Sequence, residues 1–191
     1  MNPPLDRLKD RLLRLVSSAN PFEATVYRSC TPRFATRSDL FSGEGSRRHG
    51  GRWNPKGVAV VYTSLTLETA LAETLAQNRY YGIPPENAMP RLFVAMNVKL
   101  GKVLNLGEGS VRQHLRVSLE RILGTDWREE AQAGQMPITQ ALGQASLEIG
   151  LEGLLVPSAA AAPIGQNLLI FPENLSPDSS LQLINANQLT E

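Results

Sequence analysis

The sequence predicts an α+β protein with a mixed or largely antiparallel β-sheet and a single main domain. Helical and strand-like segments are mixed along the 191 residues without the strict alternation of an α/β protein. Neither a G-x-G-x-x-G motif after an early strand nor a P-loop lysine motif is present, which argues against a Rossmann or P-loop protein. Hydrophobic residues make up 42% of the chain, enough for a substantial core.

The first half of the chain predicts two helices and two strands around one long loop. Leucines at three- and four-residue intervals after a Pro-Pro pair predict an amphipathic helix within residues 5–16. Imperfect alternation predicts a strand at 23–29, and the valine-rich segment 58–64 predicts a buried strand. Between them, residues 30–57 show little periodicity, so we expect a long loop of the functional or mobile kind. A helix is predicted for 65–78.

The second half is predicted to add helices and strands in irregular order. Its helices are expected from apolar periodicity, and Pro137 is suited to the first turn of one of them. Its strands are apolar and rich in branched residues. The expected strands are 91–100 and 102–106, joined at Gly101, then 152–158, 167–175 and 181–186; the expected helices are 110–123 and 137–150.

Composition excludes several classes of function. The single cysteine, Cys30, cannot form an internal disulfide or a cysteine-based zinc cluster, and it fits a reducing cytosol. The two histidines, His49 and His114, have no metal-ligand spacing, so we expect no metal site. The sequence contains no run of about 18 apolar residues, so we expect no membrane span. Without the pattern of a signal peptide in its first residues, the chain is expected to be cytoplasmic.

Charge is distributed unevenly along the chain. Residues 1–56 carry a net charge of +6 and residues 57–191 a net charge of −5. This asymmetry favours an anionic ligand facing the first third of the chain, although a solvated basic face would give the same pattern. Direct nucleic-acid binding is not expected, because the basic residues lack interleaved stacking aromatics.

Two arginines are candidates for binding a phosphate-bearing ligand. Arg28 ends a predicted strand and Arg52 lies in the glycine-rich segment GGRWNPKG. Guanidinium offers planar, two-pronged donation to phosphate oxygens. Gly50 and Gly51 would let main-chain N–H groups approach the same anion. The alternative is that Arg28 pairs with a carboxylate and Arg52 is solvated.

Other candidate residues have equally ordinary explanations. Trp53 and Tyr62 could stack on a planar ring or simply pack in the core. On a helical wheel Glu73 lies away from the Leu67, Leu71 and Leu75 stripe, which by itself predicts a solvated side chain. The Ser158 hydroxyl could bond a nearby backbone group; no G-x-S-x-G motif surrounds it.

Three stretches together are similar to the RES domain family, named for an arginine, a glutamate and a serine. They are YR at 27–28, GGRWNPKGVAVVYTSLTLETALAETL at 50–75 and GLLVPSAAAAPIGQNLLIFPENL at 153–175. The resemblance spans residues 23–176. It does not cover the N-terminal amphipathic helix, 1–22, or the C-terminal segment, 177–191, which contains the expected last strand.

The resemblance implies a fold like that of ADP-ribosyltransferases, with a split mixed sheet and flanking helices around a cleft for NAD. It implies NAD as substrate rather than as a prosthetic group, with cleavage of the nicotinamide–ribose bond by water or phosphate. Transfer of ADP-ribose to a protein, or a non-catalytic nucleotide- or partner-binding domain, are the alternatives. It also implies a toxin whose helix-turn-helix antitoxin covers the cleft. An oligomer is possible through the apolar stripe of the N-terminal helix.

Roles for individual residues follow from the same resemblance. Arg28 would hold the pyrophosphate or a ribose, Arg52 would make a second such contact, and Tyr62 would stack on nicotinamide. Glu73 would act in catalysis, with Arg28 and Tyr62, by stabilising the oxocarbenium-like ribose or orienting the nucleophile. Ser158 is expected to line the cleft with it.

Asn167 matches the family's asparagine before the last matched strand and is expected among the NAD-binding residues. The 30–57 loop would then lie over the cleft and select the acceptor. That role is a hypothesis from the length and composition of the loop.

Overall fold

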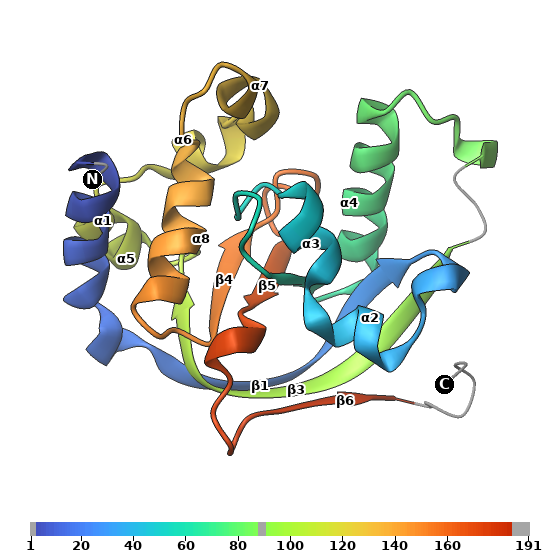
Figure 1. Ribbon diagram of the computed structural model, residues 1–191, viewed down its shortest axis with the longest axis horizontal. Coiled ribbons are helices and arrows are strands. Elements are labelled where there is room, and N and C mark those ends of the chain that lie inside the picture. The colour runs from blue at the N-terminus through green and yellow to red at the C-terminus, as the bar shows by residue number, and fades with distance from the viewer. Residues whose placement is uncertain (1–2, 88–90, 185–191) are drawn as a thin grey trace.

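The protein is built on one curved six-stranded mixed sheet (Figure 1). The computed structural model describes residues 3–87 and 91–184. The strand order is β1-β2-β5-β4-β3-β6, and β1 also pairs with β3, so five strands form a ring of pairings. Every pairing is antiparallel except β3 with β4. The strands are β1 Asn20–Cys30, β2 Val61–Ser64, β3 Leu92–Asn105, β4 Gly153–Pro157, β5 Gln166–Ile170 and β6 Ser180–Leu183.

Helices flank this sheet on different sides, which confirms the predicted mixed α+β architecture. In Figure 1, α1, α5 and α8 gather on one side, whereas α4 stands apart from them and contacts β1 and β2. The α-helices are α1 Pro3–Leu13, α2 Arg37–Ser42, α3 Glu44–His49, α4 Leu67–Tyr80, α5 Gly109–Leu115, α6 Leu119–Gly124, α7 Trp127–Gln132 and α8 Ile138–Glu148. The helices expected at the start of the chain, after β2 and before β4 are therefore present.

The strands supply apolar side chains to three clusters of buried residues, and the two larger ones share strand β5. Along β5, Leu169 belongs to the larger core beneath α1, α5 and α8, whereas Leu168 and Ile170 belong to a second core inside the curved sheet. This alternation is the two-residue period of a strand that is buried on both faces. Trp53 and Phe171 are the largest fully buried side chains and both lie in the larger core.

The first part of the expected long loop at 30–57 is instead helical, whereas residues 50–57 form a loop as predicted. That first part contains α2 and α3, and the prediction missed them because helices of only six residues are too short to show apolar periodicity. The Thr36 side chain accepts a hydrogen bond from the Asp39 amide at the start of α2. Gly43, with a φ of +66°, ends α2 and begins α3, a conformation that favours glycine.

Other boundaries also differ from the prediction: the strand expected at 58–64 begins at Val61, and the strand expected at 167–175 ends at Ile170. The strands expected on either side of Gly101 form one continuous strand, β3, and the Gly101 amide donates to Glu152 Oε2 at 2.7 Å. The helix expected at 110–123 is divided into α5 and α6, because Arg116 adopts a left-handed φ of +58° that ends α5. Ser118 then caps α6 through its side chain. Helix α7 was not predicted.

The face of α4 that the leucine stripe predicted to be buried is exposed. Leu67, Leu71 and Leu75 are 45%, 40% and 39% exposed, whereas Ala70 and Thr74 are buried. The predicted stripe also included Ala70 and Thr74, and the helix packs on the sheet through this small and polar edge of the stripe rather than through its leucines. The buried Ala70 and Thr74 lie beside the leucine stripe on the helix, and α4 contacts β1 and β2, where the candidate site lies.

Candidate active site

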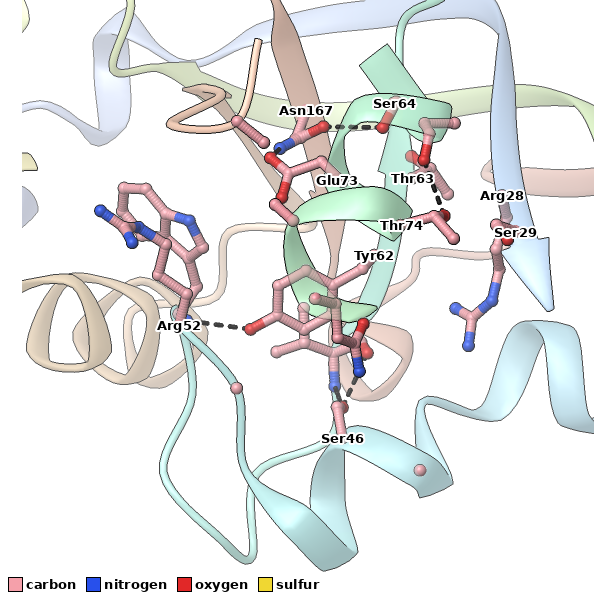
Figure 2. Close-up of a pocket in the computed structure, with 18 of the residues that line it drawn as sticks. Arg28, Ser29, Ser46, Arg52, Tyr62, Thr63, Ser64, Glu73, Thr74 and Asn167 are labelled. Carbon is pink, nitrogen blue, oxygen red and sulfur yellow. Dashed lines mark hydrogen bonds between the residues drawn. The ribbon is translucent and has the colours of Figure 1, made fainter. Parts of the chain in front are cut away.

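A cleft of about 710 Å³ opens between α4, the end of β1 and the segment that joins α3 to β2. Figure 2 shows its labelled residues around the ring of Tyr62, with Arg28 and Arg52 on opposite sides of that ring. Of the six residues given roles by the family resemblance, five line this cleft: Arg28, Arg52, Tyr62, Glu73 and Asn167. Segments that are 140 residues apart in sequence therefore meet at one site.

The Glu73 carboxylate is held by two side-chain donors. Its Oε1 accepts from Ser158 Oγ at 2.7 Å and from Asn167 Nδ2 at 2.6 Å. Each donor is itself fixed, since Ser158 Oγ accepts from the Ala161 amide at 3.0 Å and Asn167 Oδ1 accepts from Ser64 Oγ at 2.7 Å. The Ser64 bond orients the Asn167 amide so that its NH₂ group faces Glu73. One oxygen of Glu73 is thus immobilised.

Ser158 lies behind Glu73 and does not line the cleft. Its side chain is only 1% exposed, and its hydroxyl donates its one proton to the Glu73 carboxylate while it accepts from the Ala161 amide. The expectation that Ser158 lines the cleft is therefore wrong. Its position suits a residue that orients Glu73.

Arg28 enters the cleft from β1 with little to neutralise it. Its Nη1 atom is buried and has no hydrogen-bond partner among the described residues. Burial lowers the pKa of the Arg28 guanidinium, and the nearby Cys30 and Asp39 act in the opposite direction. No ion pair joins Arg28 to a carboxylate among residues 3–87 and 91–184. A buried guanidinium without a bonded carboxylate suits an anionic ligand.

Arg52 is anchored rather than solvated. Its Nη2 donates to the carbonyl oxygens of Ile122 and Leu123, both at 2.7 Å, at the C-terminal end of α6. A cation is favourable at that end of a helix. Burial lowers the pKa of Arg52, and the Glu73 carboxylate partly offsets this effect. The side chain therefore fastens its loop to α6 while it lines the cleft.

The glycines before Arg52 do not offer free amides to an anion. The Gly50 amide donates to the Ser46 carbonyl at 2.7 Å and the Gly51 amide to the Asn54 carbonyl at 2.9 Å. A Cβ atom on Gly51 would lie 2.5 Å from the hydroxyl of Tyr62. The expectation of an amide-lined anion site is wrong here, because Gly51 serves the close approach of Tyr62.

Tyr62 and Trp53 fix the same loop from two sides. The Tyr62 hydroxyl donates to Asn54 Oδ1 at 2.7 Å and accepts from the Trp53 amide at 2.9 Å. Burial raises the pKa of the Tyr62 phenol. Trp53 is 2% exposed within the larger core, so it packs there rather than stacking on a ligand. The Tyr62 ring remains part of the cleft wall.

Sequence reasoning missed two arginines of the cleft, Arg91 and Arg128. Arg91 Nε donates to Ser29 Oγ at 2.8 Å, beside Arg28. Arg128 belongs to α7 and lies over the ring of Tyr80, with 3.9 Å between its Cζ atom and the ring centre. Neither lies in a stretch that carried the family resemblance, so no motif indicated them.

Two absences concern the described part of the chain. Residues 3–87 and 91–184 contain no group of three or more histidine, cysteine, aspartate or glutamate side chains able to hold a metal ion. Within the same residues, no helix has both the length and the apolar character needed to cross a membrane.

Fold and site together define a mixed α+β protein in which an arginine-rich cleft surrounds one oriented carboxylate. The RES domain model matches residues 25–184. The chain therefore belongs to the RES domain family.

Named proteins and one solved structure are similar over most of the chain. The NAD(+) phosphorylase MbcT of Mycobacterium tuberculosis (strain ATCC 25618 / H37Rv) is 24% identical over 188 residues, 97% of this chain and 94% of that protein. The Prs ADP-ribosylating toxin of Sphingobium sp. (strain YBL2) is 29% identical over 148 residues, 78% of this chain and 82% of that protein. The solved M. tuberculosis MbcT-MbcA toxin-antitoxin complex includes a chain that matches this fold with a TM-score of 0.70 and 24% identity, covering 93% of this chain and 91% of that one.

Proposed function

We propose that this protein cleaves the nicotinamide–ribose bond of NAD. The observation that carries the proposal is the Glu73 carboxylate, held by Ser158 and Asn167 inside a cleft lined by four arginines. The family and its named relatives, an NAD(+) phosphorylase and an ADP-ribosylating toxin, support NAD as the substrate.

The charges of the cleft suit NAD on both sides of the scissile bond. The pyrophosphate is a dianion, and guanidinium groups such as Arg28 bind its oxygens in a planar, charge-assisted way. When the bond from ribose C1′ to the pyridinium nitrogen breaks, the bonding electron pair stays with nicotinamide and positive charge develops on the ribose. A fixed carboxylate beside that carbon lowers the energy of the charge. Glu73 is the acidic group that we assign to this role.

The remaining residues complete the proposal. The Tyr62 ring, fixed through its hydroxyl, would stack on nicotinamide. Arg52 would contact phosphate or ribose through the guanidinium nitrogens that α6 does not use, and Asn167 would orient Glu73 at the cleft wall. The nucleophile is water or phosphate, and its oxygen forms the new bond to C1′. The segment 30–57, which contains α2 and α3, would lie at the cleft entrance and select the acceptor.

We further propose that the core is of the ADP-ribosyltransferase type and that a protein antitoxin, with a helix-turn-helix domain, covers the cleft. A partner of this kind is supported by the likeness to a toxin solved together with its antitoxin. An antitoxin that covers the cleft would protect the producing cell from losing its NAD.

The test is to incubate the purified protein with NAD, with and without phosphate, and to identify the products. We expect free nicotinamide, together with ADP-ribose or its 1″-phosphate. Glu73→Gln, which keeps the shape but removes the charge, should slow nicotinamide release by at least about 100-fold. If a folded Glu73→Gln protein releases nicotinamide as fast as the wild type, the proposed mechanism is overturned. If the wild type releases no nicotinamide, the proposed function is overturned.

Transfer of ADP-ribose to a protein is the second candidate, favoured by the likeness to the ADP-ribosylating toxin. NAD labelled on the adenylate half separates the two. Incubated with cell lysate, it would leave its label on a protein band after transfer, whereas hydrolysis or phosphorolysis leaves all label in small molecules.

A further inference from the structure

Three aromatic rings surround Arg128 where α7 meets the C-terminal end of α4. The Cζ atom of Arg128 lies 3.9 Å from the ring centre of Tyr80, 4.3 Å from that of Trp127 and 5.7 Å from that of Tyr81. Tyr80 and Tyr81 pack edge to face, with their ring centres 5.1 Å apart. We call these four residues the arginine–aromatic cluster. In Figure 1, α7 and the end of α4 that carries the tyrosines lie toward the same end of the molecule.

This cluster presents binding groups to the cleft that the fold does not use. Tyr81, Trp127 and Arg128 all line the cleft, and Tyr81 is 59% exposed. The Arg128 Nε atom is buried without a hydrogen-bond partner among the described residues, and its side chain forms no ion pair there. The rings lie close to the guanidinium, so its N–H edge is the part left for a ligand. Two ring surfaces and an unused donor edge are suited to a planar heteroaromatic base.

The cluster lies at a suitable distance from Glu73. Tyr80 follows Glu73 by seven residues on α4, which places it two turns further along nearly the same helix face, roughly 10 Å away along the axis. In an extended dinucleotide the pyrophosphate separates the two nucleosides by a comparable length. A ligand with its reacting ribose at Glu73 therefore reaches the cluster with its other half.

We propose that the arginine–aromatic cluster binds the adenine base of the dinucleotide. Adenine stacks on the Trp127 or Tyr81 ring, and its ring nitrogens accept hydrogen bonds from Arg128. A phosphate would use the guanidinium but not the rings, so the base fits the whole cluster better. The inference rests on the proposed function, because it places the scissile end of NAD at Glu73. It makes Tyr81, Trp127 and Arg128 substrate-positioning residues for the half of NAD that does not react.

The test compares Tyr81→Ala and Trp127→Ala with the wild type. Stacking on one aromatic ring contributes about 1–3 kcal/mol, so each variant should raise the KM for NAD roughly tenfold while kcat changes less than about twofold. Calorimetry with AMP as the probe should show the same rise in Kd, and Trp127→Phe should restore most of the affinity. Leu75→Ala, on the exposed face of the same helix, is the matched control and should leave KM and kcat unchanged.

Nicotinamide mononucleotide, which lacks the adenylate half, distinguishes the possible outcomes. Its Kd should be the same for the wild type and the two alanine variants. The inference is overturned if AMP does not bind the wild type, or if the alanine variants weaken AMP and nicotinamide mononucleotide equally. If the wild type releases no nicotinamide from NAD, the proposed function fails, while AMP calorimetry still decides whether the cluster binds a base.

Discussion

Ser158 Oγ and Glu73 Oε1 lie 2.7 Å apart, although their residues are separated by 85 positions in the chain. The contact joins the loop after β4 to the middle of α4 and fixes the carboxylate from behind. Because Ser158 is buried and does not line the cleft, it acts on a ligand only through Glu73.

This geometry predicts that Ser158→Ala lowers kcat without weakening substrate binding. A hydrogen bond to a charged group contributes about 1.5–3 kcal/mol, so we expect kcat for nicotinamide release to fall roughly 10- to 100-fold. The KM for NAD should change less than about twofold. Ser64→Ala, one hydrogen bond further from the carboxylate, should have a smaller effect. A rise in KM with unchanged kcat would show that Ser158 binds substrate directly.

The core of the fold could be predicted from the sequence because it depends on local patterns. Leucine spacing marked α1 and branched apolar runs marked β4 and β5. On α4 the pattern held only in part, because the leucines face outward while Ala70 and Thr74 beside them are buried. It also failed where a single residue sets the boundary, as the left-handed Arg116 does between α5 and α6. Such positions have no periodic signature.

For the site, motif resemblance was more informative than local pattern. Glu73 appeared solvated on a helical wheel and became a candidate only through the family motif. Its bonds to Ser158 and Asn167 depend on long-range strand pairing, which no local window contains. Arg91 and Arg128 lie outside the motifs, and only the folded chain brings them to the cleft.

A second prediction concerns the balance between stability and binding at Arg28. Its guanidinium is buried with an unpartnered Nη1, so Arg28→Met should leave the free energy of unfolding unchanged or raise it by about 1 kcal/mol. The KM for NAD should rise at least about tenfold, because a charge facing the ligand is lost. Denaturant unfolding and steady-state kinetics measure the two effects. Arg28→Lys keeps the charge and is the control; a clear loss of stability in Arg28→Met would mean that Arg28 stabilises the fold.

A third prediction is that ion pairs on helix α3 contribute to the thermal stability of the protein in a pH-dependent way. Hydrogen bonds from Arg47 and Arg48 lower the pKa of Glu44 to about 2. The pKa of Glu44 in the folded protein lies below the ordinary value of 4.5. Its charged form therefore stabilises the fold fully at pH values above 4.5, and this stabilisation is lost as the pH falls toward 2. The Tm of the wild type should therefore exceed that of Glu44→Gln at pH 7, and this difference should shrink between about pH 5 and pH 2. A constant difference across that range would contradict the assignment, and added salt should reduce it.

The fourth prediction tests how α8 holds the loop that carries Arg52. A Cβ atom on Gly143 would lie 1.8 Å from the Trp53 carbonyl oxygen, which is a main-chain atom that cannot rotate away. Gly143→Ala must therefore displace either α8 or the loop, and we expect a loss of about 3 kcal/mol in unfolding free energy. Ordinarily, alanine stabilises a helix relative to glycine. Gly124→Ala, where a Cβ atom meets no neighbour within 4 Å, is the matched control.

The same substitution should also weaken the site. Movement of Trp53 would pull Arg52 from the Ile122 and Leu123 carbonyls, so the KM for NAD should rise together with the loss of stability. Tryptophan fluorescence in a Trp127→Phe background reports on Trp53 alone, since the chain has two tryptophans. We expect a red-shifted emission in Gly143→Ala, because Trp53 leaves its buried position. An unchanged spectrum with unchanged stability would show that α8 does not hold the loop in place.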